Sequence, residues 1–298
     1  MNVTPFTEQR KAAAMNSFPT PDPIRARIQI ELGDVHVDSG DAGQTLVDVV
    51  PADPSDEKDC RDAEATRVTF TEGRLEVIGP RHRGLGSGRR SGSVRVSVTL
   101  PTGSDLQTTV VAGAIHLTGS LGAVSAKTSA GDVGLQDAAS ADLRSGYGSV
   151  AAGHIGGDLR CSTGSGSIHI ERADAQVLVK NSNGDTWVGD GGRSVRVKAA
   201  NGDVTVGHAH GDLVATTANG NVRIGCVERG QVMLRTGMGR IHLGIPHGTV
   251  ARLDLRTGYG TVSSELETTS EPEPSDRTIE VSAATGAGDI DVVRAADV

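Results

Sequence analysis

Aromatic side chains are scarce in this chain. Six Phe, Tyr and Trp residues make up 2% of its 298 residues, and hydrophobic residues of all kinds make up 36%. A helical bundle or a doubly wound α/β protein of this length normally fills its core with Leu, Phe and Ile, so both classes are disfavoured. Few aromatics together with 40 Gly are also typical of disorder. Any core must therefore be thin and built from small aliphatic residues and Thr.

Cysteine, long apolar runs and an excess of basic residues are missing too. The three cysteines (Cys60, Cys161 and Cys226) fit neither a disulfide framework nor a Cys-x-x-Cys metal site, so we expect reduced thiols. No apolar run suits a signal peptide or a membrane span, which predicts a cytoplasmic protein without membrane insertion. With 29 basic against 37 acidic residues, a net charge of −8, specific nucleic-acid binding is not expected.

An internal repeat argues against disorder. The tripeptide Gly-x-(Val/Ile), with Thr186 as the one exception, recurs from residue 113 to residue 290. Seven of the nine spacings between consecutive copies fall within 17–19 residues, and an earlier copy begins at Gly33. The repeated glycines are Gly113, Gly131, Gly148, Gly166, Gly184, Gly202, Gly220, Gly239, Gly260 and Gly288.

Apolar residues alternate with polar ones on both sides of each repeated glycine, which is typical of strands with one face inward. Two short strands and a glycine corner in about 18 residues leave no room for a helix. Such a unit must stack on its neighbours to bury its inner face. We therefore expect an all-β fold: a single parallel β-solenoid of about ten 18-residue coils. A Thr/Ser column three residues before the glycine predicts inward hydrogen-bonded ladders, and Asn183, Asn201 and Asn219 predict a corner ladder.

Two segments interrupt the repeat. We expect residues 1–110 to form an N-terminal cap that includes the first coil, because a solenoid end would otherwise expose unpaired strand edges. Within it we expect a short helix at 55–65, a hairpin around Glu72 and Gly73, and an Arg-rich loop at 80–92. Residues 111–298 hold the remaining coils, with an acidic, Pro-containing loop at 265–278.

Several stretches carry a resemblance to one family. The segments PDPIRARIQIELGDVHV, KNSNGDTWVGD, AANGDVTVG and GDIDV resemble a bacterial domain-of-unknown-function family, number 4097, over roughly residues 24–293. Its members are described as β-strand repeat proteins and carry the label "putative adhesin". The resemblance implies a β-solenoid fold and supplies no catalytic residues.

Basic side chains recur four residues before the repeated glycine. They are expected to point outward from one sheet and to form a stripe. The stripe binds an acidic polysaccharide or another polyanion, or its only role is to keep the sheet soluble. The Arg-rich loop is a second candidate for an anionic partner, or is a linker. The candidate binding residues are Lys127, Arg144, Lys180, Lys198, Arg235 and Arg256 in the stripe, and Arg81, Arg83, Arg89 and Arg90 in the loop.

Two further columns follow the repeated glycine. His36, His116, His169 and His242 stand three residues after it, and stacked imidazoles can ligate zinc, but a site needs three or four converging ligands. We therefore expect a solvated column, no metal and no cofactor. Asp residues stand directly after the glycine, where Asp is also a common turn residue. These acidic positions are Asp34, Asp132, Asp185, Asp203 and Asp289.

No residue set is arranged for catalysis, so the sequence favours a non-enzymatic scaffold or binding module with a flat polar face. Its partner is an unknown protein or polyanion, and assembly of copies through the solenoid ends is a further possibility. The alternative is a protein that acts on or binds polysaccharide, using Asp185, Asp203, Trp187 and Lys198.

Overall fold

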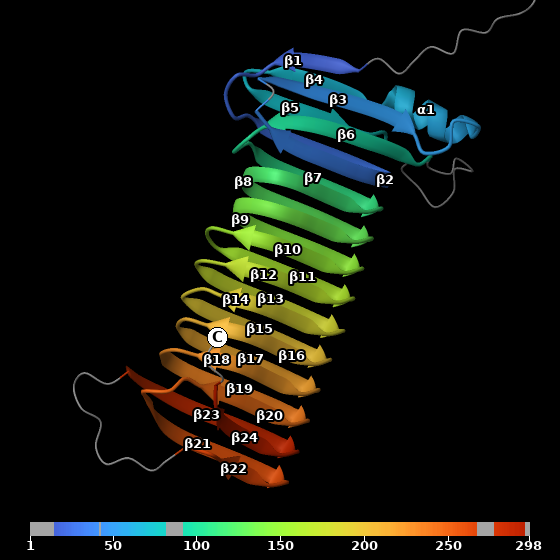
Figure 1. Cartoon of the computed structure of the whole chain (residues 1–298). Helices are drawn as coiled ribbons and strands as arrows, with labels where there is room; N and C mark the ends of the chain where they lie inside the picture. Colours follow the sequence, from blue (N-terminus) through green and yellow to red (C-terminus); the bar gives the residue numbers. More distant parts are fainter. Residues whose placement is uncertain (1–14, 42, 82–91, 267–276, 296–298) are drawn as a thin grey trace, which may run out of the picture.

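The chain forms one long stack of parallel β-coils (Figure 1). The computed structural model describes residues 15–41, 43–81, 92–266 and 277–295. Each coil contributes one strand before its glycine corner and one after it. Strands before the corner pair in one ladder, here called ladder A, and strands after it pair in a second, ladder B. The prediction of an all-β solenoid is confirmed.

In order along the stack, ladder A contains β5 (Arg74–Ile78), the first half of β2 (Arg25–Gly40), β7 (Asp105–Ala112), the second half of β8 (Ile115–Ala130), the second half of β9 (Val133–Tyr147), β11 (Leu159–Ser165), β13 (Gln176–Asn183), β15 (Ser194–Asn201), β17 (Asp212–Asn219), β19 (Gly230–Met238), β23 (Arg277–Ala287) and β21 (Thr249–Tyr259).

Ladder B contains β6 (Val94–Pro101), the remaining halves of β2, β8 and β9, then β10 (Val150–Ile155), β12 (Ile168–Ala173), β14 (Thr186–Gly191), β16 (Val204–Ala209), β18 (Val222–Val227), β20 (Ile241–Ile245), β24 (Ile290–Arg294) and β22 (Val262–Ser264).

The corner requires glycine for two reasons. Eleven corner glycines have φ between 125° and 150°, a backbone region that side chains rarely adopt. A Cβ at Gly202 would also press against the carbonyl oxygen of Gly184 in the next coil. The glycine repeats in the sequence because the same corner conformation, which requires glycine, recurs once in every coil.

The Thr/Ser column is buried, and its hydrogen bonds differ from the expected side-chain ladder. The Thr163 hydroxyl donates to the carbonyl oxygen of Gly148 at 2.8 Å, and Ser145 donates to that of Gly131 at 2.8 Å. Thr217, Thr236 and Thr285 bond to the preceding corner glycine in the stack in the same way. Each hydroxyl therefore fastens its coil to the corner of a neighbouring coil.

Thr163→Val is expected to lower the free energy of unfolding by about 1 kcal/mol, because it keeps the shape but leaves a buried carbonyl without its donor. Chemical denaturation measures the change. Thr216→Val is the matched control, since Thr216 points outward and makes no hydrogen bond to any described residue. Equal losses in the two variants would contradict the assigned role of the column.

The Asn ladder is confirmed. The Asn201 amide donates to Asn183 Oδ1 at 3.0 Å, and the Asn219 amide donates to Asn201 Oδ1 at 2.9 Å. The core beneath these corners is an array of buried Val, Leu, Ile and Ala side chains, in which Leu143, Leu159 and Leu213 are fully buried. The prediction of a core of small aliphatic side chains and Thr is confirmed.

The order of the coils in space differs from their order in the chain at both ends. The last coil in the sequence, β23–β24, lies between β19–β20 and β21–β22 (Figure 1). The first coil, β2, likewise lies between β5–β6 and β7–β8. The first and the last coil of the sequence are therefore each paired with strands on both sides.

A small cap covers the β5–β6 end. It contains α1 (Glu57–Ala65), β1 (Asn16–Pro19), β3 (Gln44–Pro51) and β4 (Arg67–Thr71), and β3 pairs antiparallel with β6. The predicted helix and the β4–β5 hairpin are confirmed. Asp62 in the helix accepts the Gly92 N–H at 2.7 Å, which ties the helix to the coil edge.

The opposite end is open. In the described part of the chain, β21 and β22 have strand partners on one side only, and Leu253 and Leu255 are only half-buried. Assembly of copies through the solenoid ends stays a prediction. No helix in the described ranges is long and apolar enough to cross a bilayer.

Candidate binding face

The six predicted stripe residues lie in one column on the outward face of ladder A. Strand pairing places Lys127 opposite Arg144, and Lys180 opposite Lys198. Ser162, Thr216 and Ala284 fill the remaining positions between them. The full column, in stack order, is Lys127, Arg144, Ser162, Lys180, Lys198, Thr216, Arg235, Ala284 and Arg256.

A second outward column lies two residues earlier on the same strands, and the sequence reading missed its bases. Arg160 and Arg196 are exposed there, beside Ser162 and Lys198. The alternation of inward and outward side chains would have identified them, because both stand an even number of residues from the glycine. Arg160 supplies the charge that Ser162 lacks in its coil.

We call the outward side chains of these two columns, from β8 through β19, the basic face. Fourteen positions on seven neighbouring strands belong to it, and the only acidic residue among them is Asp142. A chain with a net charge of −8 therefore presents one surface of the opposite sign. Its basic members are Lys127, Arg144, Arg160, Lys180, Arg196, Lys198 and Arg235.

The aspartates gather at the corners because they have a structural task there. Asp185 Oδ1 accepts the Asp203 N–H at 2.9 Å, and Asp203 Oδ1 accepts the Asn221 N–H at 2.7 Å. Asp34, Asp132 and Asp289 accept a backbone N–H of the neighbouring coil in the same way. A carboxylate is an acceptor only, so it suits an N–H that the ladders leave without a partner.

Most bases of the face have no acidic partner. Arg144 forms a two-pronged ion pair with Asp142, at 2.8 Å and 2.7 Å, which raises the pKa of the guanidinium. Arg256, beyond the face, pairs with Asp254 in the same manner. The other six bases of the face make no ion pair with any described residue, so their charges are available to a ligand.

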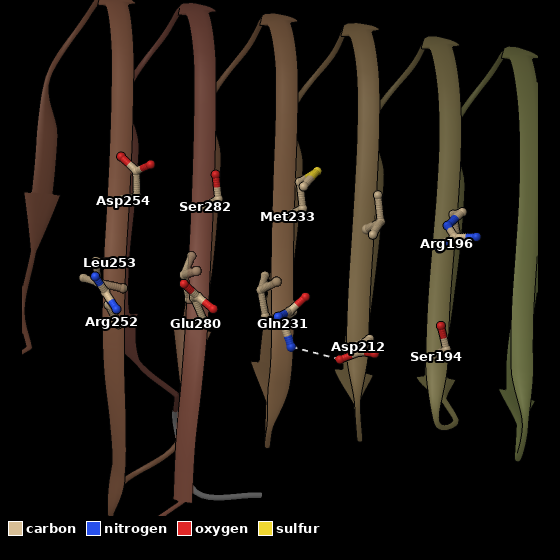
Figure 2. Close-up of a pocket in the computed structure, with 13 residues that line it drawn as sticks. Ser194, Arg196, Asp212, Gln231, Met233, Arg252, Leu253, Asp254, Glu280 and Ser282 are labelled. Atoms are coloured by element: carbon tan, nitrogen blue, oxygen red, sulfur yellow. Dashed lines mark hydrogen bonds between the residues drawn. The ribbon is translucent and has the colours of Figure 1, made fainter. Parts of the chain in front are cut away.

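A shallow cavity of about 350 Å³ lies at the β19 end of the basic face (Figure 2). Strands β15, β17, β19, β23 and β21 supply its lining. Arg196 and Arg252 stand on opposite sides, Met233 and Leu253 provide apolar surface, and Glu280 lies beside Arg252. The Gln231 N–H donates to Asp212 Oδ1 at 2.9 Å along one edge. The cavity therefore combines both charges with apolar surface.

Comparison with known proteins places the chain in a family. A family model described as Toastrack DUF4097 matches residues 25–297. The chain belongs to the Toastrack DUF4097 family. No curated protein matches the chain.

Several solved structures resemble this Toastrack chain at low identity. A "putative adhesin" from Bacteroides fragilis is 11% identical, with a TM-score of 0.38 and coverage of 94% of this chain and 96% of the other. A "putative lipid binding protein" from Parabacteroides distasonis is 12% identical, with a TM-score of 0.31 and the same two coverages. TM-scores this low give no basis for transferring a function.

The residues of the alternative polysaccharide site are only partly brought together in this Toastrack structure, since Asp185, Asp203 and Trp187 lie on neighbouring coils and Lys198 lies apart. Lys198 lies on β15 in ladder A, whereas Trp187 lies on β14 in ladder B. The Trp187 ring stacks on His169, with centroids 4.1 Å apart. The two aspartates bind backbone N–H groups, as described above. Nothing in this arrangement directs two carboxylates at one bond.

The His column also forms as expected, and His36 and His116 lie with ring centroids 5.1 Å apart. Within the described ranges, no three His, Cys, Asp or Glu side chains are arranged to hold a metal ion. Two His–Asp contacts near ladder B were not predicted from the sequence. His154 lies 3.0 Å from Asp174, and His210 lies 2.7 Å from Asp190. Arg172 and His154 lower the pKa of Asp174.

The Arg-rich loop is described only at its two ends. Arg81 is exposed and donates to Gln29 Oε1 at 3.0 Å. Arg83, Arg89 and Arg90 lie outside the described residues, so the loop stays a prediction. Cys161 and Cys226 are buried in the coils, and burial raises the pKa of both thiols.

Proposed function

We propose that this Toastrack protein is a non-enzymatic, adhesin-like binding module, and that the basic face is its contact surface for an anionic macromolecule. One observation carries the proposal: seven bases and one acid occupy the fourteen positions of the basic face, and six of the bases have no ion-pair partner among the described residues. A surface that only kept the sheet soluble would be expected to mix both signs.

The shape of the face supports binding over chemistry. Its side chains stand side by side on rigid ladders and point outward, so they suit many parallel contacts. Catalysis instead requires groups that converge on one bond. Individual exposed ion pairs contribute little, about 0.2–1 kcal/mol each, so useful affinity requires a ligand that meets several bases at once.

Retention of the protein on immobilised polymers tests the proposal. The panel contains a polyuronate, single-stranded DNA, polyglutamate and neutral dextran. We expect retention on at least one anionic polymer, release by salt, and loss of retention in the double variant Lys180→Glu/Lys198→Glu. Arg193→Glu/Arg223→Glu is the matched control, since both arginines are exposed outside the basic face and make no ion pair with described residues.

Retention on no anionic polymer would overturn the proposal. So would equal loss of retention in the two double variants, because the charge of the whole chain, and not the face, would then be responsible. Melting curves of both variants establish that each one is folded.

A further inference from the structure

We infer that the ligand of the basic face is a linear acidic polysaccharide that lies along the stack, across the strands. The inference rests on the proposed function and names the class of its ligand. Its evidence is the spacing of the bases, the chemistry of the adjoining cavity and the placement of the aromatic residues.

The bases form a straight path. Five consecutive strands of ladder A carry at least one base each: β8, β9, β11, β13 and β15. Neighbouring strands lie about 4.8 Å apart, so the path from Lys127 to Lys198 is about 19 Å long. A ligand that crosses the strands meets an unpaired base on β8, β11, β13 and β15, and the Arg144–Asp142 ion pair on β9 between them. Most folded proteins present no such regular row of anions, whereas a polymer with one acid group in each repeating unit has one.

The path continues into the cavity. Arg196 belongs to both the basic face and the cavity lining, so a polymer that follows the face reaches Met233 and Leu253 next. Sugar rings have apolar C–H faces that pack on such side chains. Glu280 lies on the far side, where its carboxylate can accept hydrogen bonds from sugar hydroxyls. A sugar ring, with its apolar face and its hydroxyl groups, suits this combination of apolar and charged side chains.

The aromatic residues argue against nucleic acid. Binding of single-stranded DNA or RNA uses aromatic rings on which the bases stack. The fourteen positions of the basic face include no aromatic residue. Tyr147 and Tyr259 stand at the corner, one residue before the turn glycine, and Trp187 lies in ladder B. The face therefore offers charge without a stacking platform.

Isothermal titration calorimetry tests the inference. The full chain is titrated with polygalacturonate oligomers of increasing length. We expect affinity to rise with length and to level off once an oligomer spans the path from Lys127 to the cavity. Lys180→Gln/Lys198→Gln is expected to weaken binding about fivefold to tenfold at low salt. The control Arg193→Gln/Arg223→Gln is expected to change it less than twofold.

Two results separate this inference from the proposed function. If oligothymidylate or polyglutamate binds through Lys180 and Lys198 while polygalacturonate does not, the polysaccharide inference is overturned and the binding module stands. If no anionic polymer binds, both are overturned. Affinity that does not depend on oligomer length would overturn the placement along the stack.

Discussion

Gly202→Ala is expected to lower the melting temperature by about 10 °C. The added methyl group meets the Gly184 carbonyl oxygen of the next coil, and φ at this position is 132°. Backbone strain of this kind costs about 1–3 kcal/mol, and forcing an extra carbon into a packed interior costs about 1–3 kcal/mol more. Together they give a loss of about 2–6 kcal/mol, and the middle of this range corresponds to roughly 10 °C for a chain of this size. Thermal unfolding followed by circular dichroism measures it.

Gly156→Ala is the matched control. Gly156 is exposed, its φ is ordinary, and a Cβ there meets nothing within 4 Å. Its melting temperature is expected to stay within about 2 °C of the parent, because surface changes of this kind are nearly neutral. If Gly202→Ala behaved like this control, the corner would have room for a side chain, and the repeat would need another explanation.

Val281→Asp is expected to destabilise the protein far more than Leu253→Asp, although the two residues lie opposite each other on paired strands. Val281 is 1% exposed because β23 lies between β19 and β21, whereas Leu253 on the terminal strand β21 is half-buried. An unpaired charge in the interior costs several kcal/mol, and one beside solvent costs much less. We expect a loss of about 4 kcal/mol or more for Val281→Asp, and about 1–2 kcal/mol for Leu253→Asp.

Hydrogen exchange of the parent protein gives a second measurement of the same arrangement. Amides of β23 are expected to exchange more slowly than those of β21, since β23 is paired on both sides. If the coils stacked in chain order, β21 would be the inner strand and β23 the end strand. Leu253→Asp would then destabilise the protein more than Val281→Asp, and the amides of β21 would exchange more slowly than those of β23. Either result would contradict the observed order of the coils.

The separation of charge in this protein has a structural origin. Aspartates occupy the corners, where their oxygens accept backbone N–H groups of the next coil, as Asp185 and Asp203 do. The outward strand positions need no acceptor, so they are free to carry bases. The corner hydrogen bonds therefore explain why five acidic side chains lie away from the basic face.

The fold could be predicted because its repeat is visible in one dimension. The corner glycine, the alternating apolar residues and the Thr column each recur once in every coil, and each reports a fixed backbone or side-chain environment. The Asn ladder could be predicted for the same reason. The partner of the Thr column could not, because identical side chains in register fit two patterns of hydrogen bonding. Distances in the structure show that Thr163 reaches the Gly148 carbonyl.

The binding face could be predicted only in part. Lys127, Lys180 and Lys198 could be predicted because each stands four residues before a repeated glycine. Side chains at the same distance before the glycine all point to the same side of the ladder. Arg160 and Arg196 were missed because their column also holds Leu178, Val214 and Met233 and shows no common residue type. The cavity could not be read from the sequence, since it joins Arg196 to Glu280 and Arg252, which are brought together by the final coil.

The sequence by itself determined the coil: its length, its glycine corner and the direction of every side chain, because these depend on local backbone geometry repeated at a fixed spacing. Only the tertiary structure decided the order of the coils. The strands of all coils offer nearly the same backbone edge for pairing. Either β21 or β23 could therefore pair with β19, and the local sequence pattern does not decide which one does. The choice depends on long-range pairing, and it places β23 inside, leaves β21 at the open end and completes the cavity beside the basic face.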